Sequence, residues 1–404
     1  MWFGGSALVA GRFGCCAFTM RSFELRKFVA PELLFGIGAR HLVGRYAKNF
    51  GAKNVLLVTD DGIRKTGLIG EIGADLTEAG ICFEVFSNVM PNPRAENVMQ
   101  GAEIYRQAGC SALVAVGGGS VIDCAKGIGI VSSDKRPIAE FEGVDKVQVP
   151  PPPLICIPTT AGSSADVSQF AIINDTERKV KIAIISKTLV PDVALIDPEP
   201  LLTLPPNLTA YTGLDVLTHA IEAYVSNASS SLTDVHALEA IRLVRKNLEN
   251  TMEHPRDLSL RGEMMLASLH AGLAFSNASL GAVHAMAHSL GGYLDLPHGE
   301  CNALLLETVI AYNYSSAPDR YDTIGEAMGC PVYTVPRGER PGVICTEIRR
   351  LRTALGVGHS LGALGVKRET IPVLAGQAMH DVCMATNPKN PKKTEIEALY
   401  ESAL

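Results

Sequence analysis

The sequence predicts an α/β domain with a parallel sheet, followed by a domain built of helices alone. In the first half of the chain, short apolar runs alternate with amphipathic stretches, a pattern typical of a parallel sheet covered on both faces. In the second half, only long helical periodicities remain. The proline-rich segment 198–206 separates the two sequence patterns. We therefore predict a domain boundary near residue 200, with domains over 20–200 and 201–404.

The composition is that of a globular protein of the cytoplasm. The 404 residues are 47% hydrophobic and 19% charged, which is ample material for packed cores. The formal charge is −6 and no basic block occurs, so we expect no nucleic-acid partner. No apolar run approaches the roughly 18 residues of a membrane helix. None of the ten cysteines falls in a CxxC spacing, which favours reduced thiols.

The first nineteen residues are interpreted as an extra segment. They are small and apolar, but no basic region precedes them and Arg12 interrupts them, so they make a poor secretory signal. We expect ordered structure to begin near Met20.

The elements follow from apolar runs and their boundaries. Buried strands are predicted at 54–59, 82–86, 112–116, 154–157, 181–185 and 193–196, with a turn at Asp60-Asp61-Gly62. Helices are predicted at 63–78, 95–108 and 121–131 in the first half, and at 209–225, 233–248, 258–274 and 283–291 in the second. Asn207 or Thr209 is expected to cap the first helix of the second half, and 331–342 to form a loop.

A glycine-rich turn indicates a phosphate-binding loop. The strand at 112–116 runs into Gly117-Gly118-Gly119-Ser120 and then a helix, where backbone N–H groups and the helix dipole favour a pyrophosphate. Asp123, in the first turn, is interpreted as structural. Asp60 ends a neighbouring strand and could accept hydrogen bonds from a ribose, which would favour NAD over NADP. The segment PTTAGSS (158–164) offers further hydroxyl groups.

A metal site is indicated in the helical half. Asp215 and His219 are four residues apart in GLDVLTHAIEAY, so a helix places both on one face. His284 and His288 repeat this spacing in GAVHAMAHSLGG, and His298 follows. Imidazole and carboxylate suit Fe(II), Zn(II) or Mn(II). The spacing leaves open whether both histidines of HxxxH bind, or whether His284 pairs with His298 while His288 stands beside the metal.

The chain resembles a known family from about residue 28 to near the C-terminus. The segments GGGSVIDCAK, PTTAGSS, GLDVLTHAIEAY, GAVHAMAHSLGG and PHGECNALLL, in this order, closely resemble the iron-dependent (group III) alcohol dehydrogenases. The resemblance implies a Rossmann-like domain that binds NAD, a helical metal-binding domain in a dehydroquinate synthase-like architecture, and an active site between them.

Residue roles are carried over from the family by motif position. The resemblance implies that Fe(II), with Zn(II) as an alternative, is held by Asp215, His219, His284 and His298. It places His288 beside the nicotinamide, where we expect it to relay a proton. The implied NAD contacts are Asp60, Asn92, Gly117, Gly118, Gly119, Ser120, Thr159, Thr160, Ser168 and Lys181.

The sequence departs from the family pattern at a few positions. The family commonly has TTAGTGSE where this chain has TTAGSSAD, and Glu307 replaces a usual proline. Cys301 and His270 have no obvious family role.

We therefore predict reversible hydride transfer between a small alcohol and NAD, with an aldehyde as the other substrate. The alternative is a regulatory or sensory protein on the same fold that binds NAD and metal with little turnover. We expect a cytoplasmic homo-oligomer, a dimer or larger, with no membrane partner.

Overall fold

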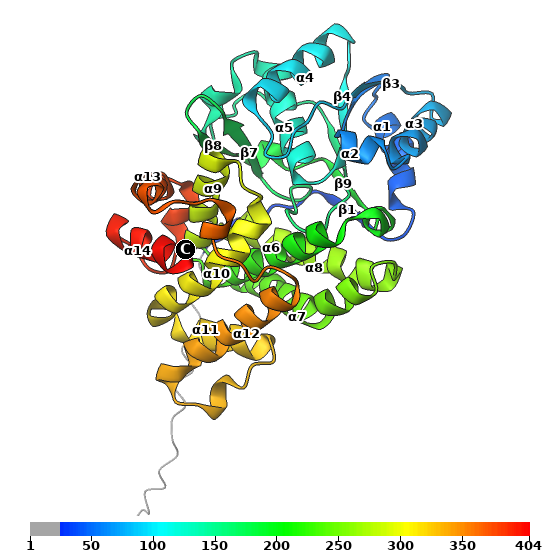
Figure 1. Ribbon diagram of the computed structural model, residues 1–404. Coiled ribbons are helices and arrows are strands. Elements are labelled where there is room, and N and C mark those ends of the chain that lie inside the picture. The colour runs from blue at the N-terminus through cyan, green and yellow to red at the C-terminus, as the bar shows by residue number, and fades with distance from the viewer. Residues whose placement is uncertain (1–24) are drawn as a thin grey trace, which may run out of the picture.

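The computed structural model describes residues 25–404, so the predicted extra segment 1–19 lies outside the described range. A parallel sheet with helices on both faces is followed by a body of helices (Figure 1). The predicted fold class, an α/β domain followed by an all-α domain, is confirmed.

The main sheet has six parallel strands in the order β1-β9-β6-β4-β2-β3. Their bounds are β1 Glu32–Phe35, β2 Asn54–Val58, β3 Cys82–Phe86, β4 Ala112–Gly117, β6 Leu154–Pro158 and β9 Val193–Ile196. A smaller sheet has the order β5-β8-β7, with β5 at Gly143–Val144, β7 at Phe170–Asp175 and β8 at Val180–Ile185.

Helices cover both faces of the main sheet because its strands are apolar on both sides. Leu56 and Val58 of β2 pack in the cluster shared with α4 (Ala95–Gln107) and α5 (Gly119–Asp134). Val55 and Leu57 pack in the cluster shared with α1 (Val43–Asn49) and α3 (Leu68–Glu78). Alternate residues of one strand therefore enter opposite cores.

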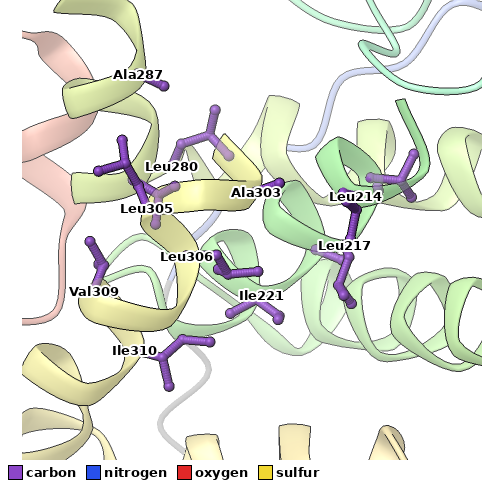
Figure 2. Packing of buried hydrophobic residues seen from close by; sticks show 14 of the residues in the cluster. Leu214, Leu217, Ile221, Leu280, Ala287, Ala303, Leu305, Leu306, Val309 and Ile310 are labelled. Carbon is purple, nitrogen blue, oxygen red and sulfur yellow. The ribbon is translucent and has the colours of Figure 1, made fainter. Parts of the chain in front are cut away.

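The helical body starts where Pro205 and Pro206 open α6. Its helices are α6 Pro206–Val225, α7 Ser231–Glu253, α8 Leu258–Ala278, α9 Ala282–Leu294, α10 His298–Asn313, α11 Pro318–Ala327, α12 Arg340–Ala354, α13 Ile371–Ala378 and α14 Lys393–Ala403. Figure 2 shows Leu214, Leu217 and Ile221 of α6 in the same buried cluster as residues of α9 and α10. This packing fixes three helices against one another.

The prediction missed some strands, and it gave other bounds for one helix and one turn. The strands β1, β5 and β7 were not predicted, and β8 pairs antiparallel with β7 outside the main sheet. The predicted helix 63–78 is two helices, α2 (Asp61–Arg64) and α3, because Gly67 between them has a φ of 89°. The expected turn at Asp60-Asp61-Gly62 is the start of α2.

Two further local predictions need correction. Neither Asn207 nor Thr209 caps α6, which begins at Pro206 with Pro205 as its N-cap; proline fits the first helical position because it has no N–H to lose. The predicted loop 331–342 contains two short 3₁₀ helices, Val332–Thr334 and Arg337–Glu339, and α12 begins inside it.

Among residues 25–404, no helix is both long and apolar enough to cross a membrane.

Candidate functional site

Four side chains from three helices converge inside the helical body. Asp215 and His219 come from α6, His284 from α9, and His298 is the first residue of α10. One potential ligand atom from each lies within 4.8 Å of the others. The Oδ1 atom of Asp215 is 3.8 Å from Nε2 of His284 and 3.9 Å from Nε2 of His298. The structure thus brings together all four expected metal ligands.

Burial keeps these imidazoles neutral. It lowers the pKa of His219, although the charges of Asp215 and Glu222 oppose the shift. It also lowers the pKa of His284 well below the usual value, although Asp215 and Asp381 oppose the shift. It lowers the pKa of His298 well below the usual value, with help from the charge of Lys181. A neutral imidazole has a free lone pair, which is the form that binds a cation.

The hydrogen bonds of Asn302, one turn after His298 on α10, indicate whether the four side chains could hold a cation. Its Nδ2 atom donates towards Oδ1 of Asp215 at 2.7 Å, Nε2 of His284 at 3.1 Å and Nε2 of His298 at 3.2 Å. Three acceptor atoms therefore point at one positively polarised group. Within residues 25–404, Nδ1 of His219 is buried without a hydrogen-bond partner. The donor set suits a divalent transition-metal ion.

His288 stands beside the four residues and is not one of the converging set. Its ring stacks on that of His298 at a centroid distance of 5.3 Å. Its Nδ1 atom lies 2.8 Å from Oδ2 of Asp381, just before the 3₁₀ helix Val382–Thr386. Of the two arrangements that the spacing left open, the geometry matches the one in which His284 and His298 face the same point.

The glycine-rich loop and the PTTAGSS segment are in contact. Gly118 is the N-cap of α5, and a Cβ there would lie 3.1 Å from Thr160. The backbone N–H of Thr159 donates to the Gly117 carbonyl at 3.1 Å. The hydroxyl of Thr159 is buried and has no hydrogen-bond partner among the described residues. Ser120 lies in the first turn of α5, so these residues surround one helix N-terminus.

Asp60 lies at the same edge of the sheet. Its side chain accepts a 2.9 Å hydrogen bond from the Ile63 N–H and so caps α2. The preceding residue, Thr59, bonds through its hydroxyl to the Val116 carbonyl at the end of β4. The carboxyl ends of β2 and β4 are therefore adjacent, which is where open α/β sheets bind nucleotides.

The remaining expected cofactor residues lie in different surroundings. Asn92, at a φ of 53°, donates to Oδ1 of Asp295 at 2.8 Å, close to the start of α10. Ser168 is buried, and its carbonyl and hydroxyl accept from Nζ of Lys126 at 2.8 and 3.3 Å. The side chain of Lys181 on β8 packs against α9, where a Cβ added at Gly291 would lie 2.8 Å from its Nζ. Burial lowers the pKa of Lys181.

Asp123 fits the structural role expected of it. Burial raises its pKa to about 6, against the charges of Lys126, Lys181 and His288 and a hydrogen bond from the Ile172 backbone. The carboxyl thus joins α5 to β7.

The departures from the family pattern have local explanations. Ser164 adopts a φ of 49°, where glycine is favoured, and its hydroxyl donates to the Ser268 carbonyl at 2.6 Å on α8. Glu307 pairs with Arg349 of α12. His270 is paired with His236, whose Nδ1 is 2.9 Å from its own.

Sequence reasoning missed three residues at this site. Glu222 follows Asp215 by seven residues and therefore lies on the same side of α6, so the helical period could have identified it. Asn302 follows His298 by four residues, which is a similar signal. Asp381 is 93 residues from His288, and no local pattern links them.

Family models and similar proteins cover most of this chain. The model of the iron-containing alcohol dehydrogenase family matches residues 30–198, and that of the C-terminal part of the family matches 209–404. Alcohol dehydrogenase 4 of Schizosaccharomyces pombe is 43% identical over 387 residues, covering 95% of this chain and 90% of that one. An NAD-dependent methanol dehydrogenase of Bacillus methanolicus is 36% identical, covering 93% and 99%.

A solved structure described as 1,3-propanediol oxidoreductase superposes with a TM-score of 0.91. It is 38% identical, and the match covers 94% of this chain and 100% of that one. Fold and site thus define a metal-dependent dehydrogenase, and the chain belongs to the iron-containing alcohol dehydrogenase family. The predicted enzyme class, an NAD-dependent alcohol dehydrogenase of the iron type, is confirmed. The relatives give no support to the regulatory alternative.

Proposed function

We propose that this enzyme acts on short primary or small secondary alcohols, moving hydride between the alcohol and NAD, and reduces the corresponding aldehydes in reverse. The observation that carries the proposal is the convergence of one carboxylate and three neutral imidazoles within 4.8 Å. The names of two relatives, a methanol and a 1,3-propanediol enzyme, support small substrates.

Asp215, His219, His284 and His298 are the proposed ligands of Fe(II), with Zn(II) as the alternative. A bound divalent cation supplies Lewis acidity, which lowers the pKa of an alcohol hydroxyl. The chain contributes a carboxylate, which attracts the cation, and three histidines that burial holds neutral. Asn302 orients Asp215 through its 2.7 Å hydrogen bond.

We assign NAD to the edge of the sheet where β2 and β4 end. The N–H groups at the start of α5 would bind the pyrophosphate, and the unpartnered hydroxyl of Thr159 would take a polar contact. Asp60 is assigned to the ribose. The other proposed contacts are Asn92, Gly117, Gly118, Gly119, Ser120, Thr160, Ser168 and Lys181. We place the division between the NAD-binding and the metal-binding domain near residue 200.

His288 is the proposed proton relay. Its Nδ1 atom is held by Asp381, so Nε2 is the nitrogen left to exchange a proton with the substrate hydroxyl or solvent. An imidazole suits this task because it changes charge near neutral pH. We further propose that the enzyme is a cytoplasmic homo-oligomer.

The test is NADH formation by protein purified without oxygen and loaded with Fe(II). Alcohols from methanol and ethanol to butanol and 1,2- and 1,3-propanediol form the panel. We expect turnover that chelation abolishes and Fe(II) restores. Protein that carries stoichiometric metal and binds NAD, yet turns over none of these alcohols or their aldehydes, would contradict the proposal.

A further inference from the structure

Glu222 of α6 reaches across to the first turn of α9 and binds it at three points. The side chain is buried, with 4% of the residue exposed. Its Oε1 accepts from the Val283 N–H at 2.7 Å, and its Oε2 accepts from the His284 N–H at 3.3 Å. The same Oε2 lies 2.6 Å from Nδ1 of the His284 ring. One carboxylate therefore contacts both the backbone and the side chain of an expected metal ligand.

These contacts replace the usual cap of α9. The N-cap residue is Gly281, which has no side chain to accept from the free N–H groups of the first turn. A Cβ at this position would lie 2.9 Å from Oε1 of Glu222. The glycine therefore leaves room for a capping carboxylate that comes from another helix.

The contacts also determine the tautomer of His284. When ionised, the Glu222 carboxylate only accepts hydrogen bonds, so Nδ1 of His284 then carries the proton. Nε2 then has the lone pair, and it accepts from Nδ2 of Asn302 at 3.1 Å on the side of Asp215. The Nδ1 atoms of His219 and His298 have no hydrogen-bond partner within residues 25–404. Of the three histidines, His284 is the one whose tautomer a buried carboxylate fixes.

The charge of Glu222 is a second way in which this residue could support metal binding. Two buried carboxyl groups, Asp215 and Glu222, belong to the cluster. Burial raises the pKa of Glu222 to about 7, and a divalent cation nearby favours its ionised form, which then balances part of the cation's charge. Among the described residues, Glu222 contacts His284 at 2.6 Å, and a neutral imidazole does not balance the charge of a carboxylate.

We propose that Glu222 is a positioning residue of the metal centre, which fixes His284 as an Nε2 ligand and supplies the second negative charge that holds a divalent cation. The inference rests on the ligand set of the proposed function. Partners of metal-bound histidines of this kind contribute about 10- to 100-fold to metal affinity.

The test measures Zn(II) affinity of the metal-free full-length protein by competition with a chelator. Glu222→Gln keeps the size and an oxygen that can accept from Val283, but it loses the charge. We expect Zn(II) binding to weaken by about 10- to 100-fold. Asp322→Asn is the matched control, because Asp322 is equally buried and its partners are Tyr314 and Arg340. This control should bind as the wild type does.

Each outcome separates the two proposals. If wild type and Asp322→Asn bind Zn(II) and Glu222→Gln binds equally well, the Glu222 proposal is wrong and the ligand set stands. If both buried-carboxylate variants weaken binding alike, the effect is one of general stability and the proposal is again wrong. If the wild type binds no metal, the ligand set itself fails. Should near-UV circular dichroism show Glu222→Gln to be unfolded, Glu222→Asp replaces it; this variant keeps the charge but shortens the reach, and unchanged affinity would overturn the proposal.

Discussion

The Nδ1 atom of His288 on α9 lies 2.8 Å from Oδ2 of Asp381, a residue 93 positions later in the chain. The other carboxylate oxygen accepts from the Cys383 N–H at 2.8 Å. Burial acts to raise the pKa of Asp381, but the charge and hydrogen bond of His288 outweigh it, so the pKa is lowered. Asp381 therefore stays ionised and holds the imidazole in one orientation.

The pairing predicts that Asp381→Asn slows turnover. Asparagine can still accept the hydrogen bond of His288 but no longer stabilises a positive charge on the ring. We expect kcat to fall at least about 10-fold, since general acid–base groups contribute that much or more. Metal content and the KM for NAD should stay close to wild type. Steady-state kinetics with a fully metal-loaded variant checks this, and an unchanged kcat and pH profile would show that His288 acts without Asp381.

Removing a ligand should abolish metal retention. His284→Ala deletes the histidine that is most deeply enclosed, with 1% of the residue exposed, and leaves Asp215 with fewer partners. After dialysis against buffer, we expect less than about a tenth of the wild-type metal content, since a three-ligand site binds far more weakly. His270→Ala is the control, because His270 pairs with His236 away from the cluster. An active His284→Ala enzyme with full metal content would exclude His284 as a ligand.

The two pairs of candidate ligands on single helices could be predicted from the sequence because helical spacing is a local property, whereas the full set with His298 came from the resemblance to the family. Asp215 and His219 share a helix face whatever the rest of the fold does, and the same holds for His284 and His288. The pairing of His288 with Asp381 could not be predicted, because it depends on how the chain folds back over 93 residues.

Missed strands have a similar cause. β1 is only four residues long, and its pairing partner β9 lies about 160 positions away. The strand β7 follows a stretch rich in serine and alanine, and its antiparallel partner β8 places it in a separate sheet. Alternation of strands and helices predicts the main parallel sheet, but it contains no signal for an added antiparallel pair.

The glycine-rich loop contacts the PTTAGSS segment at the proposed cofactor site. We therefore expect that a methyl group added at Gly119 weakens NAD binding. A Cβ at Gly119 would lie 2.5 Å from the Ser163 hydroxyl oxygen. Gly119→Ala must therefore push the PTTAGSS segment away from the start of α5. We expect the KM for NAD to rise about 10-fold, which corresponds to about 1.4 kcal/mol of lost binding. Gly70→Ala on α3 is the control, since nothing lies within 4 Å of a Cβ there. An equal KM in both variants would show that this contact does not shape the cofactor site.

Asp166 predicts a pH dependence of stability outside the metal cluster. Burial raises its pKa to about 6, against a backbone hydrogen bond and the charge of Lys126. In the unfolded chain the pKa is about 3.9. A raised pKa means that the folded protein holds this proton more tightly than the unfolded chain does. The associated stability is therefore fully present below about pH 4 and is lost as the pH rises through about 6.

Asp166→Asn removes this titration while keeping the size of the side chain. The free energy of unfolding of the wild type, relative to the variant, should fall by about 2 kcal/mol between pH 4 and 7. Urea unfolding of both metal-free proteins at several pH values measures the difference. A difference that stays constant over this range would show that Asp166 is ionised in the folded protein throughout, with Lys126 outweighing burial.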